Sequence, residues 1–250
     1  MKLINMNKYE KPPISEAVIE VKLSEGFNYK KLRAIAKKLR NVYPNSENIQ
    51  SVTWQISPNG NEQPKKISKS DVGLRLKNFD STNIITINDN SIATSRLAPY
   101  EGWAELSKRT IDGVQIVLEQ FEFFKISRIG VRYVNRLDIP LENANLVDLE
   151  EYLKVYPKMP EGMSKLINNC LMQMLFETNL EDWKCQMTTG NVQSPLLNHM
   201  SFILDIDVFS ERNLPIKPDD LMKKINQARN LKNEIFEQSL TDKARKLFGQ

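Results

Sequence analysis

The segment from Phe124 to Pro140 has the longest continuous strand pattern in the chain, and it limits the folds that the rest can adopt. Its apolar residues recur at alternate positions, and Asn135 is the one interruption. Such alternation predicts a β-strand with one face in a core. The apolar face consists of Ile129, Val131, Tyr133, Leu137 and Ile139.

The opposite face of this strand carries a row of three arginines, Arg128, Arg132 and Arg136, because successive strand side chains point to opposite sides. Neighbouring arginines would lie about 13 Å apart at about 3.3 Å per residue. Guanidinium groups need carboxylates, phosphates or open water around them. Two interpretations stay open: the row is solvated or salt-bridged to acids of neighbouring strands, or it contributes to an anion-binding face.

Two other predicted strands carry paired acids opposite their own apolar residues. These acids are Glu16 and Glu20 on an early strand and Asp205 and Asp207 on a late one. If these strands neighbour the arginine strand, the acidic and basic rows would interlock across the sheet. The same four carboxylates are also the candidates for a metal site, in the alternative that the protein is a metal-dependent nuclease or hydrolase.

The region 28–43 reads as a helix that begins at the N-cap Asn28 and has an apolar stripe. Its outer face is basic and contains no acid: Lys30, Lys31, Arg33, Lys37, Lys38 and Arg40. A helix selected for stability gains from Glu–Lys pairs, whereas contact with a phosphate backbone uses unpaired cations. We therefore consider both a solvated face and a nucleic-acid-binding face.

The order of the remaining patterns predicts an α+β fold with a mainly antiparallel sheet and packed helices. We expect strands at 14–23, 52–57, 72–79, 84–97, 166–176, 185–188 and 200–209, and helices at 103–121, 146–156, 219–236 and from 241 onward. The polar stretches 45–50 and 62–70 read as loops, the second one mobile. Residues 1–140 form an N-terminal part and residues 141–250 a C-terminal part packed into the same unit. The two parts share a strands-then-helix order, which would fit two related halves.

The sequence does not contain the residue patterns that several common kinds of site require. The nine glycines do not cluster into a phosphate-binding loop. The single histidine, His199, has no neighbouring His or Cys, and Cys170 and Cys185 are too few for a disulfide framework. We expect no cofactor, no bound metal and no catalytic residues. No apolar run approaches the roughly 18 residues of a membrane span, and the first residues lack a signal-peptide pattern, so we expect a cytoplasmic protein.

Four segments resemble a sporadically distributed family of uncharacterised prokaryotic proteins. They are the opening PPI-x-EA-x-IE at 12–20, Trp103, the R-x-G-x-RY-x-NR-x-D strand at 128–138, and the C-terminal Ile235-Phe236 with Leu240-Thr241-Asp242. The resemblance implies one cohesive unit, because these landmarks run from one end of the chain to the other. Its patchy distribution is typical of genes in mobile antiviral-defence or toxin–antitoxin operons.

These observations lead to three hypotheses about function. The first is a non-enzymatic binding protein that acts through a protein partner or self-association. The second is a nucleic-acid-binding protein that uses the basic helix, the arginine row or both. The third is the metal-dependent nuclease or hydrolase described above.

Overall fold

The computed structural model describes residues 9–55, 65–88, 90–141, 146–164, 169–215 and 217–249. Its strands are β1 (Ile14–Leu23), β2 (Asn45–Gln55), β3 (Lys65–Lys77), β4 (Asn83–Asn88), β5 (Ser91–Leu97), β6 (Ile126–Pro140), β7 (Leu171–Glu177), β8 (Lys184–Val192) and β9 (His199–Ser210). Its helices are α1 (Tyr29–Leu39), α2 (Trp103–Leu118), α3 (Pro218–Ser239) and α4 (Asp242–Lys246), with a 3-10 turn at Leu149–Glu151.

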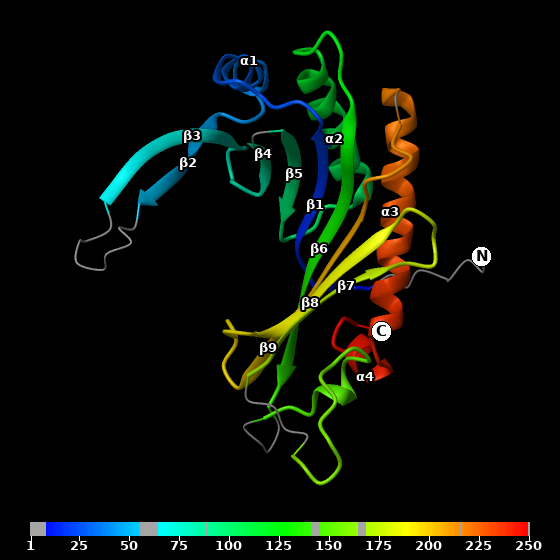
Figure 1. Ribbon diagram of the computed structural model, residues 1–250. Helices are drawn as coiled ribbons and strands as arrows, with labels where there is room; N and C mark the ends of the chain where they lie inside the picture. Colours follow the sequence, from blue (N-terminus) through cyan, green and yellow to red (C-terminus); the bar gives the residue numbers. More distant parts are fainter. Residues whose placement is uncertain are drawn as a thin grey trace.

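All nine strands belong to one sheet, in the order β2-β3-β4-β5-β1-β6-β9-β8-β7 (Figure 1). Every neighbouring pair is antiparallel. The expected α+β class with an antiparallel sheet is therefore confirmed. Strands from 1–140 and from 141–250 meet where β6 pairs with β9, so both parts of the chain build the same sheet.

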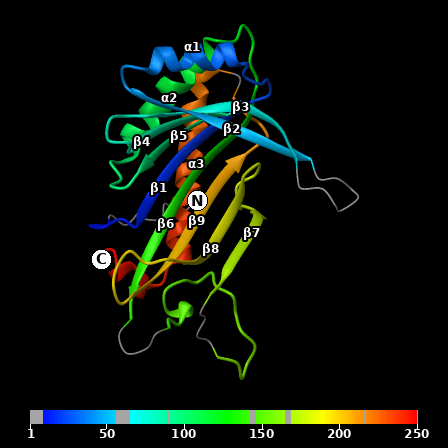
Figure 2. The same cartoon turned by 90° about the vertical axis from the view of Figure 1, so that its left-hand side faces the viewer.

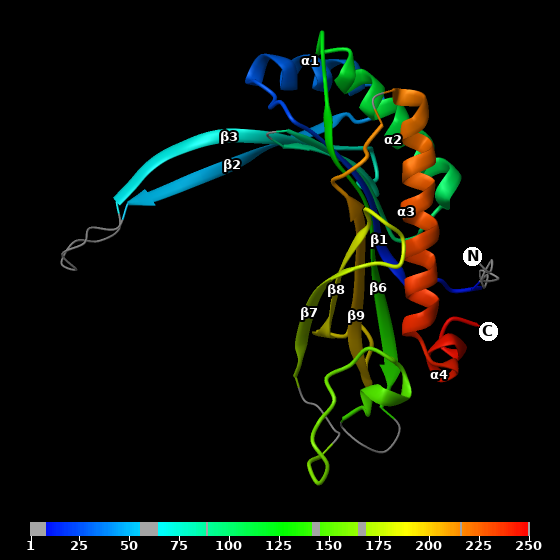
Figure 3. The same ribbon diagram turned by 45° about the vertical axis from the view of Figure 1, so that its right-hand side comes forward.

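The helices lie on one side of this curved sheet (Figures 1 and 3). The α2 helix packs on β5 and β1, and α3 packs on β6 and β9. Figure 2 looks onto the opposite face, where the strands lie in front of the helices. The sheet thus has a covered face and an open one. Among the described residues, no helix combines the length and the apolar character that crossing a membrane requires.

The covered face holds the core because the alternation in the strands meets the apolar stripes of the helices. On β6 the side chains of Ile129, Val131, Leu137 and Ile139 are fully buried. The stripe of α3 faces them, and its residues Leu221, Ile225 and Ala228 are also buried. The α1 helix starts as expected, since the Asn28 side chain accepts a hydrogen bond from the Lys31 backbone N–H. This bond satisfies one of the free donors of a helix start.

Two stretches that read as loops are strands in the structure. The polar residues 45–50 open β2, and β3 begins at Lys65, inside the stretch 62–70. The two strands pair with each other from Asn45 opposite Lys77 to Gln55 opposite Lys65. Composition suggested loops there, but pairing satisfies the backbone hydrogen bonds whatever the side chains are. Residues 56–64 lie outside the described part of the chain.

The helix expected at 146–156 is wrong, because the structure has only a three-residue 3-10 turn there. The backbone of this segment bonds to the C-terminal region instead of to itself. Leu153 forms a β-bridge with Leu240, and the Thr241 N–H donates to the Tyr152 carbonyl oxygen at 3.1 Å. These tertiary partners override the helical pattern, and Leu153 becomes fully buried.

Candidate functional site

β6, the strand that carries the arginine row, lies between β1 and β9 in the sheet (Figure 2). Alternate β6 residues face the helices and are buried, so Arg128, Arg132 and Arg136 project to the other side. Both neighbouring strands carry the acids singled out in the sequence. The three arginines therefore lie next to carboxylates and do not line an empty anion-binding site.

Arg128 is the most enclosed member of the row, with 14% of its side chain exposed. Its Nη1 donates to Glu20 Oε2 at 2.5 Å and its Nη2 to Asp207 Oδ2 at 2.8 Å. The guanidinium also lies 4.3 Å from the centre of the Phe209 ring. Gly130 makes this position possible, because a Cβ there would stand 2.5 Å from Arg128 Nη1. One cation thus links β1 to β9 across β6.

Arg132 binds Asp205 with two hydrogen bonds, from Nε at 2.8 Å and from Nη2 at 2.6 Å. These bonds raise the pKa of Arg132 above its usual value, so it stays charged. Arg136 pairs with Asp138 of its own strand at 2.9 Å, and Asp138 also accepts from Ser201 Oγ. Among the described residues, Glu16 forms no ion pair and acts on Arg132 only as a nearby charge. The geometry favours the salt-bridged interpretation of the row.

The basic helix α1 is on the helix side of the sheet, so it does not share a surface with the arginine row (Figures 1 and 3). Lys38 pairs with Glu119 after α2, and the Lys31 ammonium lies 3.6 Å from the centre of the Phe121 ring. Three other cations, Lys30, Lys37 and Arg40, are exposed and form no ion pair with a described residue. The basic surface is therefore smaller than the sequence suggests.

The remaining reactive side chains are placed as follows. His199 is in β9, where its Nδ1 lies 2.7 Å from the Leu197 carbonyl oxygen. Burial raises the pKa of the Cys185 thiol to about 12, which keeps it protonated and unreactive near neutral pH. Cys170 packs half-buried against the core. Within the described part of the chain, no three His, Cys, Asp or Glu side chains are arranged to hold a metal ion.

A second polar site, not expected from the sequence, lies on the covered side of the sheet. It is a pocket of about 470 Å³, which we call the α3 pocket. The chain entering β1 passes beneath the C-terminal half of α3 here (Figure 3). The lining residues are Tyr9, Pro12, Pro13, Ile14, Tyr100, Gly102, Trp103, Tyr133, Asn135, Arg229, Lys232, Asn233, Phe236 and Glu237.

Ring contacts and hydrogen bonds fix the walls of the α3 pocket. The hydroxyls of Tyr100 and Tyr133 lie 2.7 Å apart, and their rings meet edge to face. Trp103 Nε1 donates to Asn226 Oδ1 at 2.9 Å, which holds the indole against α3. The amide nitrogen of Asn135 donates to the Leu204 carbonyl oxygen at 3.0 Å. The pocket is therefore a preformed enclosure whose walls are partly aromatic.

Comparisons with known proteins assign no family to this arrangement. No family model and no curated protein matches the chain. Among solved structures, it aligns with the di-domain ARO/CYC StfQ from the steffimycin biosynthetic pathway at 12% identity. That alignment covers 93% of this chain and 97% of the other, with a TM-score of 0.16. A likeness of this size carries no argument about fold or function.

Four segments that are far apart in the sequence meet at the α3 pocket. Pro12, Pro13 and Ile14 come from the opening motif, and Trp103 begins α2. Tyr133 and Asn135 come from β6, and Phe236 comes from α3. These residues are up to 224 positions apart in the sequence. The fold thus brings these four segments to one place.

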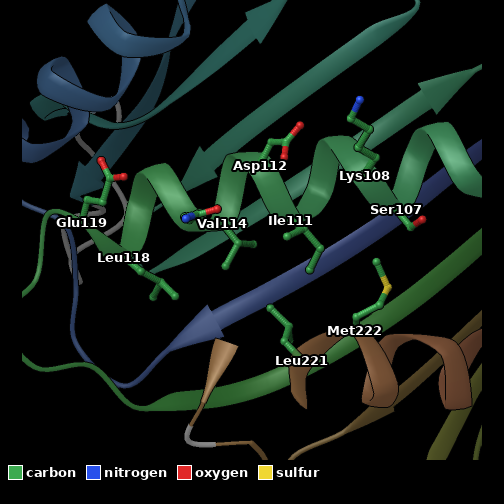
Figure 4. Close-up of a pocket in the computed structure, with 10 residues that line it drawn as sticks. Ser107, Lys108, Ile111, Asp112, Val114, Leu118, Glu119, Leu221 and Met222 are labelled. Atoms are coloured by element: carbon green, nitrogen blue, oxygen red, sulfur yellow. The ribbon is translucent and has the colours of Figure 1, made fainter. Parts of the chain in front are cut away.

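Helices α2 and α3 also enclose a larger groove, of about 770 Å³ (Figure 4). Ile111 and Leu118 of α2 point toward Leu221 and Met222 of α3. Asp112 and Lys108 lie at its rim and point away from it. The groove therefore offers mainly apolar contact between the two helices, with the polar side chains of Ser107, Gln115 and Glu119 also in its lining.

Two features of the sequence point to the α3 pocket. The buried stripe of α3 runs through Leu221, Ile225 and Ala228, and the next position at helical spacing is Lys232. A lysine at a core position is unusual, because Lys is almost never fully buried unless it is paired. This interruption of the stripe could have marked the site. The interruption of the β6 face by Asn135 was a second sign of the same kind.

Proposed function

We propose that this chain is a non-enzymatic binding protein whose main interaction surface is the free edge of the sheet at β7, where a second copy pairs with it. The observation that carries this proposal is the apolar, exposed character of that edge strand. An unpaired strand edge presents a row of free backbone donors and acceptors to another chain. We also propose that the protein acts in a mobile defence or toxin–antitoxin operon. Identifying the neighbouring genes tests this proposal.

β7 ends the strand order and pairs only with β8 in the described part of the chain. Leu171 is 77% exposed and Leu175 is 61% exposed. Soluble proteins usually protect edge strands with charges, prolines or bulges. β7 has no proline, its pairing with β8 has no register shift, and its one charged residue is the last, Glu177. An exposed strand of this kind is suited to adding another strand.

The sequence of β7 is complementary to itself in one antiparallel register. With Gln173 opposite Gln173 of the second copy, Leu171 would face Leu175, and Met172 would face Met174. Each of these pairs forms twice around the two-fold axis. Apolar side chains would meet apolar ones, the amides could bond to each other, and no charge would enter the centre. This match favours a second copy of the chain as the occupant.

The other edge of the sheet lacks these properties. The described side chains of β2 are polar or charged at its start, including Asn45 and Glu47. Glu47 pairs with Lys77 of β3 at 2.6 Å. Charged and polar edges discourage pairing between sheets. The difference between β2 and β7 suggests that one edge is kept free for association and the other is protected.

The test is the molar mass of the purified protein in solution, measured by sedimentation velocity over a range of concentrations. We expect a dimer for the parent chain and a monomer for Leu175→Lys, because two lysines would lie beside the paired strands. The matched control is Leu197→Lys, at an apolar residue that is 91% exposed and outside β7. This control should remain a dimer.

Two results would reject pairing at β7. One is a parent chain that stays monomeric at the highest concentration reached. The other is a dimer that persists in Leu175→Lys. A monomer that still captures a different protein through β7 would move the proposal from self-association to strand addition by a partner.

A second candidate function, binding of nucleic acid, is favoured by three exposed cations of α1 that form no ion pair with a described residue, Lys30, Lys37 and Arg40. The arginine row contributes little to this candidate because its charges are matched by acids. The metal-dependent alternative is less favoured, because Glu20 and Asp207 are bound to Arg128 and Asp205 is bound to Arg132.

A further inference from the structure

The α3 pocket contains a buried ammonium group that forms no ion pair with a described residue. Lys232 is 4% exposed, and its Nζ lies 3.6 Å from the centre of the Tyr133 ring. No described residue offers this ammonium a hydrogen-bond acceptor or an ion-pair partner. Burying an unpaired charge is costly, and in practice such a group shifts its pKa or acquires a partner. The cation–π contact with Tyr133 compensates only part of that cost.

A second cation lines the same pocket one helical turn away. The Arg229 guanidinium lies 5.1 Å from the centre of the Trp103 ring and forms no ion pair with a described residue. Arg229 and Lys232 are three positions apart, so they share one face of α3. Two like charges on one face repel each other, which lowers the stability of the empty pocket.

Glu237 is the acid among the lining residues of the pocket, and its carboxylate already has partners. Glu237 accepts hydrogen bonds from the Tyr9 hydroxyl at 2.9 and 3.0 Å. It also pairs with Arg245 of α4 at 3.3 Å. Burial raises the pKa values of Tyr100 and Tyr133, so both hydroxyls stay neutral. The pocket therefore has an excess of positive charge.

We propose that the α3 pocket binds a small ligand that carries one anionic group, a carboxylate or a phosphate, on an apolar or aromatic body. The anionic group would contact Lys232 and Arg229, and the body would pack against the rings of Tyr100, Trp103 and Phe236. The volume of about 470 Å³ lies in the range typical of small-molecule sites. This site is independent of pairing at β7, which lies at the edge of the sheet.

A purely structural role for Lys232 explains the pocket less well. At this position the stripe of α3 calls for an apolar residue, and an apolar side chain of similar length would avoid the cost of burying a charge. A lysine kept there without a partner acid is understandable if a ligand supplies the partner. The tendency of buried, perturbed groups to occur at functional sites supports the same conclusion.

The experiment is a thermal-unfolding and calorimetric titration of the full chain at neutral pH with three probes that share a phenyl ring. Benzoate and phenyl phosphate carry the two anionic groups, and benzamide is the neutral control. A ligand that binds only the folded state raises the melting temperature. We expect one or both anions to raise it and benzamide to leave it unchanged, and the stronger anion identifies the group.

Variants then locate the binding. Lys232→Met should raise the dissociation constant of the anion at least tenfold, and Arg229→Gln should raise it several-fold. Lys224→Met is the matched control, since Lys224 lies on the same helix, over the Trp183 ring and outside the pocket. It should bind the anion as the parent does.

Three results would overturn this site. One is an equal response to benzamide, which would indicate an apolar hollow without a role for charge. Another is anion binding that survives both Lys232→Met and Arg229→Gln. The third is the absence of any response to either anion at millimolar concentration. Arg229→Gln also serves if Lys232→Met does not fold, because Arg229 is only partly buried.

Discussion

At the scale of single residues, Lys232 links the stability of the protein to pH. Burial and the nearby charge of Arg229 lower the pKa of Lys232 from 10.5 to about 7, against the opposite effect of Glu237. Between pH 7 and pH 10.5, Lys232 is protonated in the unfolded chain and neutral in the folded one, so the unfolded chain binds one more proton. Stability should therefore rise as the pH increases from 7 toward 10.5, with no contribution from Lys232 to the slope below 7.

We predict that Lys232→Met makes the protein more stable at neutral pH, by up to about 5 kcal/mol, because the cost of burying the ammonium disappears. The stability of the variant should also lose its rise between about pH 7 and about pH 10. Urea unfolding of both proteins at several pH values measures this. Lys224→Met should behave like the parent, and a clear loss of stability in Lys232→Met would show that the ammonium stabilises the fold.

The arginine row allows a comparison between residues of one type. Arg128→Gln would leave the carboxylates of Glu20 and Asp207 close together without their shared cation. We predict a loss of about 2 to 3 kcal/mol for this variant, because breaking an enclosed pair leaves an uncompensated charge. Arg132 is 49% exposed, and its single partner Asp205 is 12% exposed. Arg132→Gln should therefore cost less than Arg128→Gln, about 1 to 2 kcal/mol, since water reaches the cation but the carboxylate loses its partner. Chemical denaturation measures both, and equal losses would contradict the role of enclosure.

Residue types and spacing were enough to foresee part of these sites. The row on β6 and three of its acids followed from strand alternation, because side chains two residues apart share a face. The pairing of Arg136 with Asp138 was also accessible, since both residues lie on the same face. The meeting of Lys232, Trp103 and Tyr133 was not accessible, because their distance depends on how α3 crosses the sheet.

At the scale of elements, the structure changes what α1 is expected to do. Lys31 and Lys38 are engaged with the region after α2, and Arg33 also has an interaction partner. About three of the six cations therefore remain for a phosphate backbone. We predict weak, sequence-independent binding of nucleic acid with a log–log salt slope of about −2 to −3. The measurement is fluorescence anisotropy with duplex and single-stranded oligonucleotides across salt concentrations.

The variant for this test combines Lys30→Glu, Lys37→Glu and Arg40→Glu, and it should abolish the binding. A matched control reverses three exposed lysines in the C-terminal part of the chain, Lys154, Lys158 and Lys246, and keeps the net charge equal. Loss of binding in both variants would indicate a general charge effect and not a surface on α1. No binding by the parent at low salt would remove the nucleic-acid hypothesis.

Elements with a complete internal pattern were predicted well, and elements that depend on a partner were not. β1 and α1 follow from their own periodicity and caps. The early residues of β2 and β3 have no such pattern, and pairing across the hairpin makes them strands. The segment 146–156 has a helical pattern, but the bridge from Leu153 to Leu240 draws its backbone into tertiary contacts.

At the scale of the whole molecule, the seam between β6 and β9 decides whether the chain is one unit or two. The two strands pair from Ile129 opposite Ser210 to Pro140 opposite His199, and α3 covers both. Residues 1–140 alone would expose the whole β9-facing edge of β6 and lose the cover of α3. The β6 side chains that this helix buries would then face water.

We therefore predict a single cooperative unfolding transition for the full chain, with equal calorimetric and van't Hoff enthalpies. The fragment 1–140 should lack a cooperative transition and should aggregate, because a long apolar strand becomes an edge. Mixing it with the fragment 141–250 during refolding should restore the transition, since the two fragments carry complementary strands. Two separate transitions in the full chain, or a fragment 1–140 that melts cooperatively, would show instead that the two parts are independent domains.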